Sequence, residues 1–187
     1  MRIAVLALQG DFAEHEAIFK LLNIQTCQLR QKKDLQQPFD ALILPGGEST
    51  VQGKLLRELD MFDELRSRIS NGLPVMATCA GTILLAQQLL DDATVHLGTL
   101  GISVRRNAYG RQLASFHTSG TFAGIKDSPM RFIRAPQIEF CVPGVEVLAE
   151  HDGRITAVRQ GKQLAMTFHP ELGSDTRIAE YFLSEVL

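Results

Sequence analysis

The chain has 187 residues, of which 45% are hydrophobic and 21% are charged, and its formal net charge at pH 7 is −2. These values suit one compact globular domain, residues 1–187, with a substantial core. A charge so close to zero gives no reason to expect a nucleic acid or an anionic membrane as partner. No apolar run is long enough to cross a bilayer and the N-terminus lacks a signal-peptide pattern, so we expect a cytoplasmic protein.

The first half of the sequence predicts strands that alternate with helices. Apolar residues recur at helical spacing in 13–22, 55–69 and 82–90, with a break expected near Asp60. Short apolar runs at 3–8, 24–29, 41–44 and 74–77 predict buried strands between them. This alternation indicates βαβ units, so we expect an α/β fold in three layers, flavodoxin-like, with a central, mostly parallel sheet.

The second half of the sequence has a different pattern, with more strands expected than helices. Turn residues separate short strand-like runs, and the runs 154–159 and 163–167 flank Gln160-Gly-Lys162, which predicts a hairpin. Residues 176–187 close the chain with an expected helix. The remaining expected strands are 102–104, 113–116, 132–135 and 145–149.

Cys79 stands where an apolar run changes into a helical pattern. The chain has three cysteines, Cys27, Cys79 and Cys141, and their odd number and spacing argue against a disulfide framework or a zinc site. A nucleophile on a sharp strand-to-helix turn needs small neighbours, and Ala77, Ala80 and Gly81 would provide them. The start of a helix also favours a thiolate. The alternative is a structural cysteine buried in the core.

Two other segments follow predicted strands, at the edge where open α/β sheets bind ligands. In Phe168-His-Pro-Glu171, His169 and Glu171 can point to one side of an extended segment, and a carboxylate beside a histidine supports its protonated form. In Pro45-Gly-Gly-Glu48, two glycines allow backbone N–H groups to approach a ligand closely. Taken alone, either segment could be an ordinary surface turn. Together with Cys79 they predict a cysteine hydrolase or transferase that acts on an amide or ester.

The motifs resemble a known family. Cys79-Ala-Gly81 and His169-Pro-Glu171 are similar to the signature of class I (triad) glutamine amidotransferases. Further segments narrow the resemblance to glutaminase subunits of pyridoxal 5′-phosphate synthase, and it extends over the whole chain. These segments are Leu8-Gln-Gly-Asp11 with Glu14-His15, Pro45-Gly-Gly-Glu-Ser-Thr50, Arg106-Asn-Ala-Tyr-Gly-Arg-Gln112, Phe132-Ile-Arg-Ala-Pro136 and Phe168-His-Pro-Glu-Leu172.

The resemblance implies a role for each matching residue. Cys79 would be the nucleophile, His169 the general base and acid, and Glu171 its orienting partner. The N–H groups of Gly47 and Ala80 would bind the oxyanion. The resemblance also implies that L-glutamine is hydrolysed without cofactor or metal, and that ammonia passes to a separate synthase subunit in a hetero-oligomeric complex. The residues expected to contact glutamine are Gly46, Gly47, Glu48, Arg106, Ile133 and Arg134.

The sequence departs from the family pattern at three positions. Ala77 replaces the usual first glycine of the nucleophile turn, Arg105 stands where an acidic residue is common, and His117 replaces a common glutamate. A β-carbon at residue 77 is tolerable only if its φ is negative. Two alternatives remain: the glutaminase subunit of another amidotransferase, such as imidazole glycerol phosphate synthase, and a non-catalytic binding subunit with a decayed nucleophile turn.

Overall fold

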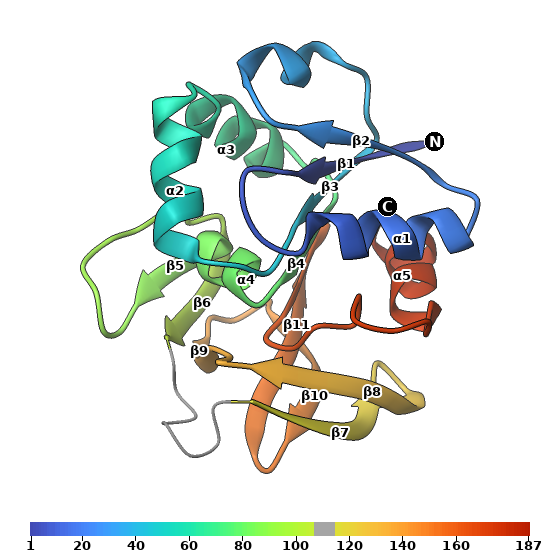
Figure 1. Cartoon of the computed structure of the whole chain (residues 1–187). Coiled ribbons are helices and arrows are strands. Elements are labelled where there is room, and N and C mark those ends of the chain that lie inside the picture. Colours follow the sequence, from blue (N-terminus) through green and yellow to red (C-terminus); the bar gives the residue numbers. More distant parts are fainter. Residues whose placement is uncertain (107–114) are drawn as a thin grey trace.

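The computed structural model of the chain describes residues 1–106 and 115–187. Within these ranges the chain forms a 10-stranded sheet, a separate two-stranded hairpin and helices on both sheet faces (Figure 1). None of the helices in these ranges combines the length and apolarity needed to cross a membrane. The predicted α/β fold with three layers is confirmed.

Five parallel strands form the half of the sheet that follows the flavodoxin-like pattern. Their order is β2-β1-β3-β4-β12, and each pair of neighbours is parallel. The inner strands β1, β3 and β4 are buried and almost entirely apolar, whereas the edge strand β2 is largely polar and only its last residue is buried. Their bounds are Arg2–Leu6 (β1), Gln25–Leu29 (β2), Ala41–Leu44 (β3), Val75–Thr78 (β4) and Gln163–Met166 (β12).

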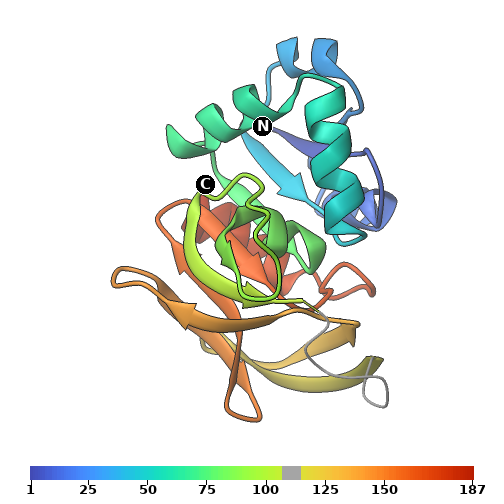
Figure 2. The same ribbon diagram turned by 90° about the vertical axis from the view of Figure 1, so that its left-hand side faces the viewer.

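Beyond β12 the sheet continues through antiparallel pairs to a parallel pair at its far edge. The order there is β11-β9-β6-β5, with β10 also paired to β11, while β7 and β8 form the separate hairpin below the sheet (Figures 1 and 2). The predicted hairpin that joins β11 to β12 is confirmed. The bounds are Ala86–Leu89 (β5), Leu100–Arg105 (β6), Ser115–Phe122 (β7), Ile125–Ile133 (β8), Gln137–Cys141 (β9), Glu146–His151 (β10) and Arg154–Gln160 (β11).

Two cores lie on opposite faces of the parallel strands, because side chains alternate along each strand. Ala4 and Leu6 of β1 pack with α2, α3 and α4, whereas Ile3 and Val5 pack with α1 and α5. The predicted break near Asp60 separates α2 from α3. The helices are Phe12–Leu21 (α1), Ser49–Glu58 (α2), Phe62–Ser70 (α3), Ala80–Leu85 (α4) and Arg177–Tyr181 (α5), with a 3₁₀ turn at Lys32–Gln36 and a π-helical turn at Phe182–Val186.

Three predictions of secondary structure were wrong or incomplete. The expected strand 113–116 lies partly outside the described residues, and the expected strand 132–135 overlaps only the end of β8, so most of the β7–β8 hairpin was not expected. The expected helix 82–90 ends at Leu85, because Ala86 takes extended dihedral angles (φ −59°, ψ 134°) and begins β5, which pairs with β6. Strand β9 was not expected. Its Phe140 is 66% exposed while Ile138 is buried, so the apolar positions of β9 follow neither a buried run nor a clean alternation.

Candidate active site

Cys79 lies on a strained turn between β4 and α4. Its dihedral angles are φ +46° and ψ −104°, a region that residues with a side chain rarely occupy. The turn is tied to β12, because the Cys79 N–H donates to the Met166 carbonyl at 2.8 Å and the Thr82 hydroxyl donates to the same oxygen at 2.6 Å. The side chain is 7% exposed. This is the geometry of a nucleophile at a strand-to-helix turn.

Ala77 fits its position without distortion. It lies inside β4, fully buried, between Leu44 of β3 and Ala165 of β12. Its φ is not among the positive values of the chain, so the β-carbon meets the condition that the sequence imposed. The strain of the turn is confined to Cys79, and the departure from glycine at position 77 leaves the turn intact.

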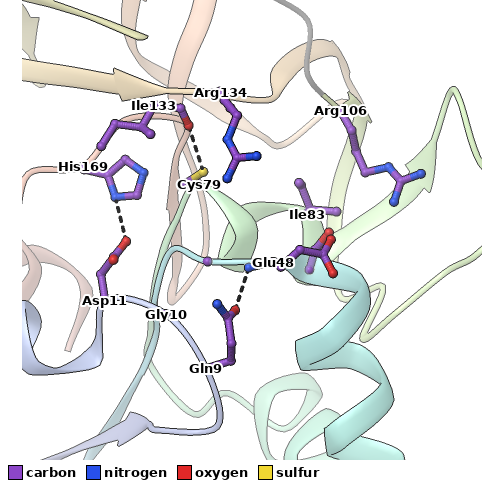
Figure 3. Close-up of a pocket in the computed structure, with 12 residues that line it drawn as sticks. Gln9, Gly10, Asp11, Glu48, Cys79, Ile83, Arg106, Ile133, Arg134 and His169 are labelled. Atoms are coloured by element: carbon purple, nitrogen blue, oxygen red, sulfur yellow. Dashed lines mark hydrogen bonds and ion pairs between the residues drawn. The ribbon is translucent and has the colours of Figure 1, made fainter. Parts of the chain in front are cut away.

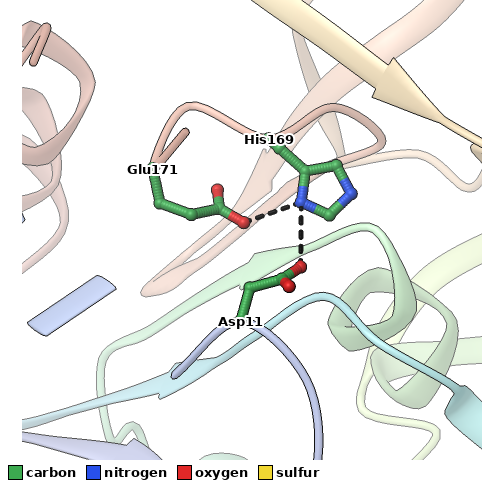
Figure 4. Close-up of side chains that lie close together, drawn as sticks. All are labelled: Asp11, His169 and Glu171. Carbon is green, nitrogen blue, oxygen red and sulfur yellow. Dashed lines mark hydrogen bonds and ion pairs between the residues drawn. The ribbon is translucent and has the colours of Figure 1, made fainter. Parts of the chain in front are cut away.

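His169 follows the end of β12, the strand next to β4. Its backbone N–H donates to the Arg131 carbonyl of β8 at 2.8 Å, which fixes the segment against the hairpin. Its Nδ1 lies 2.7 Å from Oε1 of Glu171 (Figure 4). Both side chains are almost completely buried. The two residues therefore form the pair that their spacing predicted.

The protonation states of His169 and Glu171 depend on burial and on their contacts. Burial disfavours the imidazolium form of His169, but hydrogen bonding to the Cys79 side chain and to Glu171 raises its pKa to about 10. Burial also favours a neutral Glu171; the nearby His15 and the hydrogen bond from His169 outweigh it and lower the pKa of the carboxyl. The site favours a protonated histidine beside an ionised glutamate.

A pocket of about 380 Å³ opens in front of Cys79 and His169 (Figure 3). Its size is within the range of small-molecule sites. Among the residues predicted to bind glutamine or carry the reaction, those that line it are Gly47, Glu48, Cys79, Arg106, Ile133, Arg134 and His169.

Three predicted residues lie behind the lining. Glu171 is behind His169, and Ala80 is buried directly after Cys79. Gly46 packs against the histidine: a β-carbon there would lie 2.3 Å from Cε1 of His169 and 2.8 Å from Oδ2 of Asp11. Glycine at position 46 is thus required by the close approach of the imidazole ring.

The Gly46-Gly47 loop is held from several sides. The Gly46 carbonyl accepts from the Asp11 N–H at 3.2 Å, and the Glu48 N–H donates to Oε1 of Gln9 at 2.7 Å. Gly47 has φ +146°, which favours glycine. The Glu48 carboxylate caps α2 by accepting from the N–H groups of Thr50 and Val51. The structure therefore gives Glu48 a capping contact that the sequence did not predict.

The two arginines of the pocket differ. The Arg106 guanidinium lies 2.8 Å from Asp92 and 3.7 Å from Asp91, and also donates to the Thr50 hydroxyl. Arg134 has φ +43°, and its side chain lines the same pocket as Cys79 (Figure 3). The rest of the predicted segment Arg106–Gln112 lies outside the described residues. The other departures lie on strands: Arg105 pairs with Glu139 of β9 at 3.0 Å, and His117 is opposite Arg131 in the β7–β8 hairpin.

Several residues of the site were not predicted. Gln9, Gly10, Asp11, Ser49 and Ile83 also line the pocket. Asp11 places Oδ2 3.4 Å from Nδ1 of His169, and burial raises the pKa of this aspartate (Figure 4). Asp11, His169 and Glu171 place their carboxylate and imidazole atoms within 4.8 Å of one another, but an Nδ1 that carries a proton has no lone pair for a metal ion. The available signal was position: residues 9–11 follow the carboxyl end of β1.

A cysteine on a strained turn, a buried His-Glu pair and a glycine loop at the carboxyl ends of parallel strands are typical of triad glutamine amidotransferases. The comparisons with known proteins agree. The chain belongs to the SNO glutamine amidotransferase family, whose sequence model matches residues 5–187.

Relatives and solved structures match over nearly the full length. The pyridoxal 5′-phosphate synthase subunit PdxT of Desulfitobacterium hafniense (strain Y51) is 54% identical over 186 residues, covering 100% of this chain and 94% of that protein. The PdxT subunit of Methanocorpusculum labreanum is 51% identical, covering 100% of this chain and 98% of that protein. A crystal structure of a glutamine amidotransferase matches with a TM-score of 0.91 at 46% identity, covering 97% of this chain and 96% of that chain.

Proposed function

We propose that this chain is the glutaminase subunit of pyridoxal 5′-phosphate synthase. It hydrolyses L-glutamine to L-glutamate and ammonia and delivers the ammonia to a partner synthase subunit. The observation that carries the chemistry is the convergence of Cys79 and His169 on one pocket, with Nδ1 of His169 2.7 Å from Glu171. Full-length identity of 46–54% with subunits named PdxT supports the pathway and does not favour imidazole glycerol phosphate synthase.

The reaction follows from these side chains. The Cys79 thiolate attacks the side-chain amide carbon of glutamine, and the carbonyl electrons move onto oxygen. The C–N bond then breaks as His169 gives its proton to the leaving nitrogen, which yields ammonia and a thioester. His169 next takes a proton from water, whose oxygen attacks the thioester carbon; the C–S bond then breaks, which releases glutamate and restores the Cys79 thiolate beside the His169 imidazolium. Glu171 supports the imidazolium form at each proton transfer.

The pocket offers groups for the rest of the substrate. The N–H groups of Gly47 and Ala80 are proposed donors to the oxyanion. Gly46, Glu48 and Ile133 are proposed to lie along the bound glutamine. Arg106 and Arg134 are the proposed partners of its α-carboxylate, for which a guanidinium offers a matching fork of donors. Because Arg106 is bound to Asp92, Arg134 is the less encumbered of the two arginines.

The chemistry of ammonia, the product, indicates why a partner subunit is needed. Ammonia released into solvent would be protonated and diluted, so its transfer requires a second subunit that covers the pocket. We propose a hetero-oligomeric complex in a cytoplasmic setting, with glutamine as the substrate of this chain and no metal or cofactor in the glutaminase step. The whole chain, 1–187, is proposed to act as one domain.

Cysteine replacement tests the function. Cys79→Ala should abolish glutamate release in the presence of the synthase while it leaves the fold and partner binding intact, because the loss of one sulfur at this turn disturbs little packing. Cys141→Ala is the matched control, since burial raises the pKa of Cys141 and it lies outside the pocket. An electrophilic glutamine analogue should label Cys79 and spare Cys27 and Cys141. Substantial glutamate production by a folded Cys79→Ala complex would contradict the proposal.

A further inference from the structure

A buried histidine that the proposed reaction does not use lies behind the triad. We propose that His15 of α1 is a positioning residue of the glutaminase, which holds Glu171 in place and in its ionised form by approaching Oε1, the oxygen that also accepts from His169. The inference rests on the proposed function and extends it by one residue.

His15 lies close both to the strand that carries Cys79 and to the carboxylate of Glu171. Its Nε2 lies 3.0 Å from the Thr78 hydroxyl oxygen and 3.6 Å from Oε1 of Glu171. Thr78 ends β4 directly before Cys79, so one imidazole contacts both the strand that carries the nucleophile and the glutamate that supports the base. The His15 side chain is 1% exposed. A histidine that served only as a helix surface residue would not be buried at this junction.

The neighbours of Nε2 determine its protonation. A ring nitrogen without a proton would direct its lone pair at the Glu171 carboxylate, which is unfavourable. With the proton on Nε2, this nitrogen donates to the threonine hydroxyl at 3.0 Å, and the partial positive charge of the N–H also lies 3.6 Å from the carboxylate, beyond hydrogen-bond distance. Burial lowers the pKa of His15 although Glu171 opposes it, which favours a neutral ring, and a neutral ring with its proton on Nε2 still donates to Thr78.

The ionised carboxylate of Glu171 has few other contacts that favour its charge. Oε1 accepts from His169, and Oε2 has no hydrogen-bond partner among the described residues. An ionised carboxylate at this depth would otherwise take up a proton. The titratable groups that face Glu171 are His15, His169 and Asp11; Asp175 lies across a small cavity from it, but is held by Arg177 at 2.6 Å.

This arrangement matters for turnover. If Glu171 became neutral, the His169 imidazolium would lose its counter-charge, and both proton transfers would slow. Glutamine itself would still bind, because His15 does not line the pocket. The role therefore appears in kcat and in its pH dependence, not in KM.

Three variants test this in the complex with the synthase. His15→Leu removes the imidazole beside the carboxylate and leaves the Thr78 hydroxyl without this partner, and we expect kcat to fall about tenfold or more, the effect of leaving buried polar groups unpaired. The acid limb of the kcat profile should also move to higher pH, with KM for glutamine unchanged. His15→Gln, whose amide nitrogen can replace Nε2, should recover much of kcat. Thr78→Val should shift the profile in the same direction, and Thr156→Val, at a buried threonine of β11, should not.

A double-substitution cycle shows whether His15 acts through Glu171. In a Glu171→Gln background, His15→Leu should lower kcat little further. An equal loss in both backgrounds, or an unchanged pH profile in His15→Leu with equal losses for Leu and Gln, would overturn the inference and leave a purely structural histidine. If the wild-type complex released no glutamate, the proposed function would fail and this inference with it. The outcomes of the variants overturn the inference alone, so the two failures are distinguishable. Melting temperatures of all variants identify any loss that arises from unfolding.

Discussion

The Gly46→Ala substitution probes the packing of the His169 ring. The added methyl carbon would lie 2.3 Å from Cε1 of His169, and ordinary contacts begin at about 3.4 Å. The ring or the loop must therefore move by roughly 1 Å. Residue 46 does not have a positive φ, so the substitution strains the site through this contact and not through the backbone.

A displacement of this size should be visible in turnover. A misplacement of about 1 Å at a reacting group can lower the rate about 100-fold, and the 2.7 Å hydrogen bond to Glu171 would also lengthen. Overpacking should lower the free energy of unfolding by about 1–3 kcal/mol, a loss of several degrees in melting temperature. The complex should remain folded at assay temperature.

The assay is glutamate release by the variant in complex with the synthase. Gly173→Ala is the matched control, because it also lacks a positive φ and its nearest contact would be 3.4 Å, to Arg131. It should keep wild-type turnover. If Gly46→Ala kept wild-type turnover as well, the ring would not pack against this loop in the working enzyme, and the proposed geometry of the base would be refuted.

Three further predictions concern the triad and the partner. Glu171→Gln should lower kcat more than it weakens glutamine binding, and His169→Asn should lower kcat at least as much, since proton transfer contributes about 10²–10⁴-fold; steady-state kinetics check both. The stabilising effect of the His169–Glu171 pair should be full between about pH 4.5 and 6.5, fade as pH rises towards 10 and also fade in stronger acid, because the pKa of His169 is raised and that of Glu171 is lowered. The melting temperature of wild type relative to Glu171→Gln, measured across pH, should follow this course; a constant difference would contradict it. The isolated chain should hydrolyse glutamine weakly and the synthase should increase the rate greatly, whereas equal rates would exclude gating by the partner.

The fold could be predicted where local pattern and burial agree. The parallel strands β1, β3 and β4 are short apolar runs, and the break near Asp60 appears as an interruption in helical spacing. The strand Ala86–Leu89 could not be predicted, because its apolar residues continue the helical period of Ile83 and Leu84, and only pairing with β6 makes it a strand. Tertiary contacts decided between two patterns that the sequence allowed.

The residues of the site that belong to recognisable sequence motifs could be predicted. Cys79, His169 and Glu171 stand at strand ends in recognisable patterns, and the structure brings them together. Asp11 and His15 belong to the quoted segments but received no role, since a single acid or histidine near a helix start has many uses. Their closeness to His169 and Glu171 depends on the position of α1 over the sheet, which no local pattern reveals.

The parallel pairing of β4 with β12 has a consequence for how the protein matures. His169 follows Cys79 by 90 residues in the chain, yet the strands before them are neighbours in the sheet. A ribosome makes β4 long before β12, and non-local strand pairing is slow. The proposed nucleophile, Cys79, therefore lacks the proposed base, His169, until one of the last strands to be synthesised inserts between β4 and β11. On the proposed mechanism, glutamine hydrolysis begins only once β12 is in place, so a chain that ends before His169 should release no ammonia.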